Sequence, residues 1–200
     1  MHMRWRSVAL PLSLAFIVVA ATAHAPPQRS AAELMDVLMW NRESIGGPFT
    51  LTDHHGHQRT DKDFRGKLLL VYFGYTTCPD VCPTDLQQIG LAITALGSRA
   101  EAVQPLFVTL DPARDTSKRL AAYVPNFHPQ MIGLGGSATA VHRAAATYRV
   151  YFNKVALKTG GYAIEHAAFT YMMDRDGKYL GYFPPGTSAA QMVQAITPQL

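Results

Sequence analysis

The chain has 200 residues, 48% of them hydrophobic, which is enough to bury one sizeable core, so we expect a single domain. Its 18 lysines and arginines only slightly outnumber its 14 aspartates and glutamates, and the formal net charge is +4. The basic residues are scattered singly and do not form the clustered stripe that phosphate binding produces, so we expect no nucleic-acid partner.

Residues 1–25 are typical of an export signal. Arg4 and Arg6 form a basic start, the stretch 8–20 is apolar, and small residues follow. This stretch is shorter than the roughly 20 apolar residues of a membrane-spanning helix, which favours a cleaved signal peptide over an N-terminal membrane anchor. Both alternatives place the rest of the chain outside the cytoplasm. We therefore expect a periplasmic protein, either soluble or tethered to the inner membrane.

Residues 26–46 are expected to form a linker or N-terminal extension, with a polar, helix-prone stretch at 31–40. The domain itself is expected to span residues 47–200. A Gly-Gly-Pro sequence at 46–48 breaks the chain, and a short strand begins at 49–51. This strand predicts an N-terminal strand or hairpin added to the main sheet.

Five apolar runs predict the main strands, and the first of them is apolar almost throughout, as expected for a strand covered on both faces. The predicted strands are 67–73, 103–110, 130–134, 169–173 and 179–183. The last two flank an Asp-Arg-Asp-Gly-Lys turn, which predicts a hairpin. The predicted helices are 83–96, 117–123, 138–148 and 189–196. Strands that alternate with helices and end in a hairpin predict an α/β fold, with a central mixed β-sheet flanked by helices.

Two cysteines, Cys78 and Cys82, lie between the carboxyl end of the first apolar strand and the next helix, in a segment (75–82) that we name the cysteine loop. Helix amino termini carry unpaired N–H groups and a partial positive charge, which favour the thiolate form. A thiolate is both the nucleophile of disulfide exchange and a ligand of soft metals such as Cu(I) and zinc. A structural disulfide is less expected, because so short a closed loop would stabilise the fold weakly. The pair therefore predicts a redox or metal site.

A histidine would complete such a metal site, and His166 is the best candidate. It lies in a flexible, glycine-containing stretch just before a core strand, where thioredoxin-like folds bring a loop against the cysteine loop. Three more histidines, His54, His55 and His57, lie in a polar segment (54–57) that we name the histidine turn. We interpret it as a solvated turn, although imidazoles could also form a second metal site.

The segment 73–83, Phe-Gly-Tyr-Thr-Thr-Cys-Pro-Asp-Val-Cys-Pro, resembles the signature of the Sco/SenC family of copper proteins. Two further segments are similar to that family. They are Thr-Leu-Asp-Pro-Ala-Arg-Asp-Thr at 109–116 and the histidine-bearing strand and hairpin at 165–183. The similarity extends over most of residues 47–197 and implies a thioredoxin-like fold.

The resemblance also implies a function. Members of the family bind Cu(I) or Cu(II) through two cysteines and one histidine and assist assembly of the dinuclear copper centre of cytochrome c oxidase. Those ligands fall on Cys78, Cys82 and His166, which implies one copper ion per chain and a copper-accepting oxidase subunit of the subunit II type as partner. The chain departs from the family pattern at Glu165 and Ala167, where Asp and a hydroxyl residue are common, and this affects hydrogen bonding around the ligand.

Alternatives to a copper metallochaperone remain for the cysteine pair. One is a thiol-disulfide oxidoreductase that keeps the cysteines of the target's copper site reduced, with Cys78 and Cys82 as the attacking and resolving thiols. Another is a peroxidase-like thiol enzyme, a class that shares the general architecture. Replacing His166 distinguishes the copper metallochaperone from the thiol-disulfide oxidoreductase, because only metal delivery needs the imidazole.

Other polar residues near the site have two interpretations. Asp80 is either an outer ligand or an ordinary residue of the helix start. The charged residues of segment 111–115 are expected to brace a loop near the site rather than to bind metal. Met172 and Met173 are adjacent on a predicted strand, so their side chains point to opposite faces and we expect them in the core.

Overall fold

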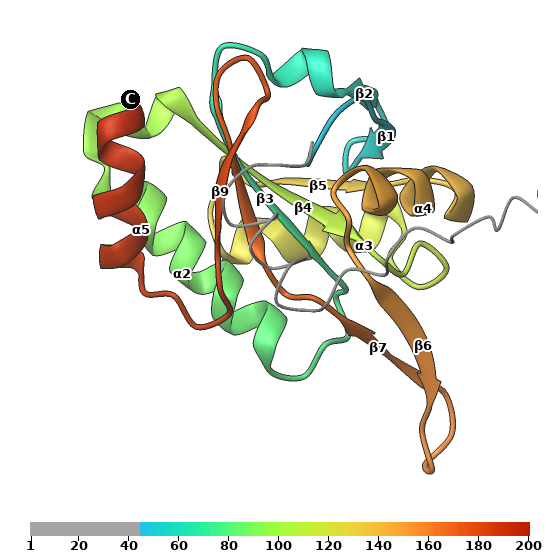
Figure 1. Ribbon diagram of the computed structural model, residues 1–200. Helices are drawn as coiled ribbons and strands as arrows, with labels where there is room; N and C mark the ends of the chain where they lie inside the picture. The colour runs from blue at the N-terminus through green and yellow to red at the C-terminus, as the bar shows by residue number, and fades with distance from the viewer. Residues whose placement is uncertain (1–44) are drawn as a thin grey trace, which may run out of the picture.

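The computed structural model describes residues 45–200 (Figure 1). The expected export signal at 1–25, the helix-prone stretch at 31–40 and nearly all of the linker at 26–46 lie outside the described residues. In the described part of the chain, no helix is both long enough and apolar enough to cross a membrane.

The main sheet, counted over residues 45–200, has seven strands. They are β1 (Thr50–Asp53), β2 (Gln58–Thr60), β3 (Leu68–Gly74), β4 (Val103–Thr109), β5 (Ile132–Gly135), β8 (Thr170–Met173) and β9 (Tyr179–Phe183). Their order across the sheet is β2-β1-β5-β4-β3-β8-β9 (Figure 1). The central strands β3, β4 and β5 are parallel, and the outer strands pair antiparallel. All seven residues of β3 are buried, as the apolar sequence predicts.

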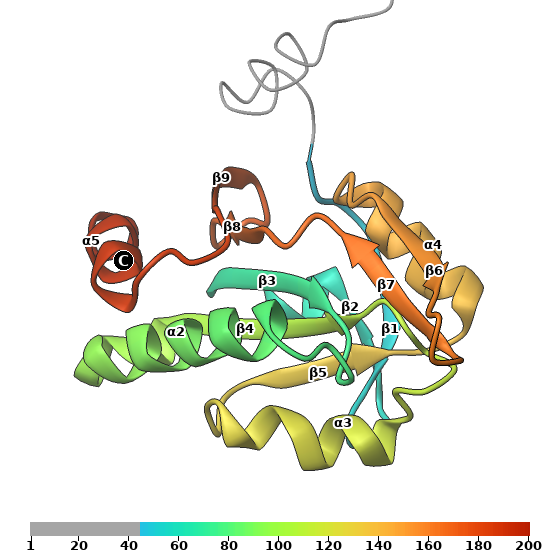
Figure 2. The ribbon, with the colours of Figure 1, turned by 90° about the horizontal axis from the view of Figure 1, so that it is seen from below.

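Helices cover both faces of this sheet. The helices of the described part are α2 (Val81–Ala95), α3 (Ser117–Tyr123), α4 (Ala138–Thr147), α5 (Ala189–Ile196) and four short 3-10 helices, Asp61–Phe64, Gly97–Ala102, Val124–Asn126 and Thr197–Gln199. Figures 1 and 2 show α2 and α3 on one face and α4 on the other, and α5 packs against α2. The structure confirms the predicted α/β fold, with a mixed sheet flanked by helices and an added N-terminal hairpin, β1–β2.

Most predicted boundaries agree with the structure, and α3, β9 and α5 have the predicted residues. Helix α2 begins at Val81, two residues earlier than predicted. Pro83 therefore lies in the first turn of α2, where its missing N–H would have had no helical partner. Cys82 consequently lies inside the helix, as its second residue, and Cys78 lies three residues before the helix start.

The sequence predicts a flexible stretch before the strand 169–173, and this prediction is wrong. In the structure, β6 (Phe152–Ala156) and β7 (Tyr162–His166) form a separate antiparallel hairpin, which projects from the main body (Figure 1). Most of its side chains are exposed or half-buried, and only Ile164 is buried. A hairpin of this kind lacks the apolar run that marks a covered strand, so its sequence signal is weak. The end of β7 carries His166.

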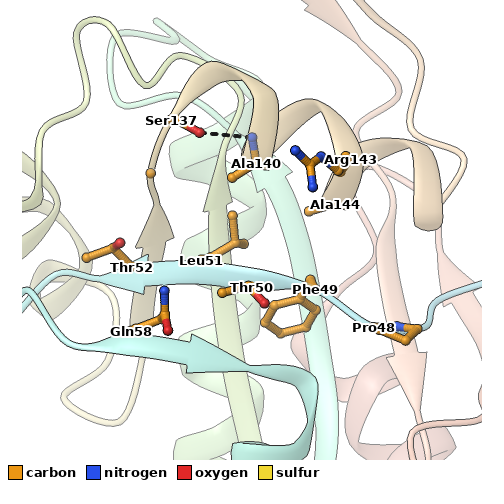
Figure 3. A pocket seen from close by; sticks show the side chains of 11 residues that line it. Pro48, Phe49, Thr50, Leu51, Thr52, Gln58, Ser137, Ala140, Arg143 and Ala144 are labelled. Carbon is orange, nitrogen blue, oxygen red and sulfur yellow. Dashed lines mark hydrogen bonds between the residues drawn. The ribbon is translucent and has the colours of Figure 1, made fainter.

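A pocket of about 430 Å³ lies between β1 and α4 (Figure 3). Phe49 and Leu51 line one side, and Ser137 and Arg143 line the other. The Ser137 hydroxyl also accepts a hydrogen bond from the backbone N–H of Ala140 at 3.2 Å, which caps α4. No lining side chain of this pocket is a cysteine, histidine, aspartate or glutamate. The residues that could bind metal or exchange disulfides lie elsewhere, at the cysteine loop.

Candidate metal centre

The cysteine loop joins the end of β3 to the start of α2 (Figure 2). A turn follows β3, in which the backbone N–H of Cys78 donates to the carbonyl of Tyr75 at 3.2 Å. Cys82 is the second residue of α2. The sulfur of Cys78 accepts hydrogen bonds from the backbone N–H groups of Asp80 and Cys82. The loop therefore directs unpaired N–H groups of the helix start at one of the two sulfurs.

Strand β7 brings His166 to the cysteine loop. Its Nε2 lies 3.6 Å from Sγ of Cys82, although 84 positions separate the two residues in the sequence. Cys82 has no exposed surface and Cys78 is half-buried, and the two cysteines form no disulfide. The rings of Tyr72 and Tyr75 meet the imidazole edge to face, with centroids 6.5 and 6.0 Å away. The structure therefore places the histidine singled out from the sequence in contact with one of the two cysteines.

The two thiols differ in acidity. A hydrogen bond from the thiol of Cys82 lowers the pKa of Cys78 to about 5, and two backbone N–H groups stabilise the same thiolate. That hydrogen bond, together with burial, raises the pKa of Cys82 well above its usual range. Burial lowers the pKa of His166, which keeps the imidazole neutral and its nitrogen lone pair available. At neutral pH the site holds one thiolate, one thiol and one neutral imidazole.

Alkylation of the native protein is expected to modify Cys78 with a pH midpoint near 5, because only the thiolate reacts. An unperturbed thiol has a pKa of about 8.5. Cys82 should react much more slowly, since it is buried and keeps its proton. Mass spectrometry after brief iodoacetamide treatment at a series of pH values measures both rates. In Cys82→Ala the midpoint of Cys78 should rise, and equal rates for the two cysteines of the native protein would contradict this account.

The donor set fits a soft metal ion. Two thiolates and one imidazole suit Cu(I) and also Cu(II). Among residues 45–200, however, no three His, Cys, Asp or Glu side chains lie close enough to hold an ion as they stand. Cys82 contacts His166, while its proton is shared with Cys78. A metal ion would therefore have to displace this proton, so metal binding at the site should release protons.

Gly74, at the end of β3, has no room for a side chain. A Cβ there would lie 3.0 Å from Sγ of Cys82, 2.9 Å from the ring of Tyr72 and 3.2 Å from the ring of Phe107. We expect Gly74→Ala to displace the Cys82 sulfur and to lower the free energy of unfolding by about 1–3 kcal/mol through overpacking. Chemical denaturation measures this loss. Gly181→Ala, with no atom within 4 Å of the new Cβ, is the control and should change stability by less than about 0.5 kcal/mol, so equal losses would refute the steric argument.

The histidine turn lies apart from the cysteine loop. It follows β1, which is separated from β3 by β5 and β4. Nδ1 of His54 accepts a hydrogen bond from the backbone N–H of Gly133 at 3.0 Å. The carboxylate of Asp53 accepts the backbone N–H groups of His55 and His57, both at 2.9 Å. The two bonds to Asp53 are those of a tight turn, as the sequence predicts.

The other candidate residues have clear positions. Asp80 is exposed at the N-cap of α2, but its side chain makes no capping hydrogen bond. Met172 and Met173 are both buried, as predicted. The sequence does not single out Tyr75, whose ring meets that of His166, or Tyr162, whose hydroxyl donates to Asp111. Tyr75 lies inside the family-like signature, whereas no local pattern marks Tyr162.

The family model that matches the chain, SCO1/SenC, covers residues 39–200. The chain belongs to the SCO1/SenC family. Protein sco1 of Schizosaccharomyces pombe is 38% identical over 159 residues, which cover 78% of this chain and 60% of the relative. Protein SCO1 of Saccharomyces cerevisiae is 41% identical over 144 residues, which cover 70% of this chain and 49% of the relative. The chain therefore spans between about half and three fifths of the length of these two SCO1/SenC relatives.

Solved SCO1/SenC structures have the same fold. The structure of Bradyrhizobium japonicum ScoI with copper bound has a TM-score of 0.74 at 40% identity, over 78% of this chain and 100% of that chain. The crystal structure of yeast Sco1 with copper bound has a TM-score of 0.71 at 37% identity, over 78% of this chain and 88% of that chain. The thioredoxin-like architecture predicted from the sequence is thereby confirmed. Glu165, where the family pattern commonly has Asp, is exposed in this SCO1/SenC member. It directly precedes His166 along β7, so the two side chains point to opposite faces of the strand.

Proposed function

We propose that this protein is a copper metallochaperone that assists assembly of the copper centre of cytochrome c oxidase. The proposed ligands of one Cu(I) or Cu(II) ion per chain are Cys78, Cys82 and His166. The observation that carries the proposal is the 3.6 Å contact between Cys82 and His166. It occurs in a fold whose solved relatives at 40% and 37% identity have copper bound. Copper is the cargo of the protein in this proposal.

The acidities and exposures of the proposed ligands suit the capture and release of a copper ion. Cys78 is half-buried and is a thiolate at neutral pH, so it is the first ligand that an arriving ion meets. Binding then displaces the proton of Cys82, and the neutral ring of His166 completes the donor set. Release proceeds by ligand exchange, in which a thiolate of the acceptor bonds to copper as Cys78 leaves. Cys82 and His166 leave last because they are the more buried ligands.

The proposed partner is a copper-accepting oxidase subunit of the subunit II type, outside the cytoplasm. The location that we propose is the periplasm, with the protein either soluble or tethered to the inner membrane. The basic start and apolar stretch of residues 1–25 support this location.

A thiol-disulfide oxidoreductase is the second candidate function, and the low pKa of Cys78 favours it. The Cys78 thiolate would attack a disulfide of the target, form a mixed disulfide and release one target thiolate. Cys82 would then attack the Cys78 sulfur, which releases the second target thiolate and leaves a Cys78–Cys82 disulfide. Thioredoxin-type enzymes usually have a proline in the loop that faces the cysteines, and residues 162–170 contain none.

Copper transfer tests the proposed function. Copper-loaded protein is mixed with the metal-free copper domain of an oxidase subunit II, the two proteins are separated, and the copper in each is measured. We expect copper to move to the reduced acceptor. Retention of copper by this protein would contradict the chaperone proposal. Reduction of a disulfide-bonded acceptor without copper transfer would favour the oxidoreductase.

A further inference from the structure

Segment 111–115 follows β4 and contacts both halves of the candidate metal centre. It starts beside the cysteine loop, because the backbone N–H of Leu110 donates to the carbonyl of Gly74 at 2.7 Å. Its two carboxylates, Asp111 and Asp115, are buried, with exposed fractions of 0% and 3%. A buried carboxylate is stable only where hydrogen-bond donors or cations surround it. The donors that surround these two come from different parts of the chain.

Asp115 fixes the start of the cysteine loop. Its Oδ2 accepts the backbone N–H of Thr76 at 2.9 Å and the hydroxyl of Thr109 at 2.6 Å. Its Oδ1 accepts the hydroxyl of Thr76. Since Thr76 lies two residues before Cys78, these bonds hold the chain that leads to the first sulfur against the end of β4.

Arg114 fixes the strand that carries His166. Its Nε donates to the carboxylate of Asp111, which also accepts the hydroxyl of Tyr162 at 2.8 Å. Nη1 of Arg114 donates to the carbonyl of Tyr162 at 3.0 Å. The guanidinium lies over the Tyr162 ring, 3.9 Å from its centroid. The ion pair therefore holds both the backbone and the side chain of one β7 residue.

The contacts of Arg114 and Asp111 with Tyr162 act on the face of β7 that carries His166. Tyr162, Ile164 and His166 alternate along β7, so their side chains share one face of the strand. Ile164 on this face is buried in the core. Arg114 also lies 5.9 Å from the ring centroid of Tyr75, the ring that meets the imidazole edge to face. One side chain thus contacts the histidine strand and the cysteine loop at once.

We infer that Arg114 and Asp115 are positioning residues that hold the cysteine loop and the His166 strand at the separation needed to share one ion. They are adjacent in sequence, and each grips a different half of the site. The predicted effect on copper binding rests on the proposed function. The contacts of Arg114 and Asp115 with the two halves of the site are present in the metal-free chain. Neither side chain is a ligand in this scheme.

Hydrogen exchange of the metal-free protein tests whether the contacts of Arg114 hold β7 in place. In Arg114→Ala, the amides paired between β6 and β7 should exchange at least about tenfold faster, because hydrogen bonds to a charged group are lost. Amides of β3 and β4 should keep their rates. Arg99→Ala, an exposed arginine in the 3-10 helix Gly97–Ala102, is the control and should change neither set. Equal exchange in the two variants would overturn the inference.

Electron paramagnetic resonance of the Cu(II)-loaded protein tests the positioning. Arg114→Ala should lose the nitrogen coupling from His166 and bind copper about 10- to 100-fold more weakly, the usual cost of losing a group that orients a ligand. Arg114→Lys, which keeps the charge but not the two-point contact, should recover part of both. An unchanged signal and affinity in Arg114→Ala would overturn the inference. If the unmodified protein binds no copper, the proposed function fails, and the exchange experiment alone decides on the inference.

A milder variant covers the case in which Arg114→Ala does not fold. Tyr162→Phe removes only the hydroxyl that donates to Asp111. It should accelerate exchange in the β6–β7 pairing in the same direction and by a smaller factor. Unchanged exchange in this variant would count against the inference, because the lost hydrogen bond to Asp111 is one of the contacts by which segment 111–115 is inferred to hold β7.

Discussion

Cys82→Ser is expected to weaken copper binding by more than about 100-fold, because changes to residues that merely support a ligand already cost about 10- to 100-fold. The serine hydroxyl is a hard donor and a poor ligand for Cu(I), whereas its size is close to that of the thiol. Cys82 is also the sulfur that contacts His166 and shares a proton with Cys78. Competition with a chelator of known affinity measures the change.

The control for this substitution lies in the same loop. Thr77→Ala alters an exposed residue beside Cys78 and should leave the copper affinity within about twofold, as surface changes usually do. Thermal unfolding of both variants separates loss of a ligand from loss of the fold. An unchanged copper affinity in Cys82→Ser would exclude this cysteine from the site.

His166→Ala is expected to separate the two candidate functions. Loss of the imidazole removes the only nitrogen ligand of the proposed set, so copper delivery to an oxidase subunit should fall by at least about 100-fold. Disulfide exchange should change little, because the low pKa of Cys78 is due to Cys82 and to backbone N–H groups. Reduction of a model disulfide and copper transfer are measured on the same preparation.

His55→Ala is the matched control for this experiment. His55 is exposed in the histidine turn, and its backbone N–H, which the substitution retains, makes the hydrogen bond to Asp53. Both activities should stay at their normal level in this variant. If His166→Ala still delivered copper while disulfide exchange collapsed, the roles assigned to the imidazole and the thiols would be wrong.

The main sheet and its helices could be predicted because their signals are local. Strand β3 is an apolar run, and α5 begins with Ser188 and Gln191 in a capping box. The hairpin β6–β7 could not be predicted in this way. Its stability depends on contacts with residues distant in sequence, such as the bonds of Arg114 to Tyr162 across 48 positions.

The sequence predicts which residues make up the candidate site, but it does not predict how they are arranged. The cysteine spacing and the family-like segments indicate Cys78, Cys82 and His166. The sequence gives no sign that the two sulfurs share a proton or that Gly74 must lack a side chain, because both facts depend on the packing of β3 against α2. The bracing expected of segment 111–115 is present, and the structure adds the specific contacts to Tyr162 and Thr76.

The central claim is that one copper ion is bound by Cys78, Cys82 and His166. X-ray absorption at the copper edge of the Cu(I)-loaded protein tests it most directly, because it reports which atoms surround the metal. The account predicts one copper per chain with two sulfur ligands and one imidazole nitrogen, and loss of the imidazole contribution in His166→Ala. A copper environment without sulfur, or an imidazole contribution that persists in His166→Ala, would contradict it.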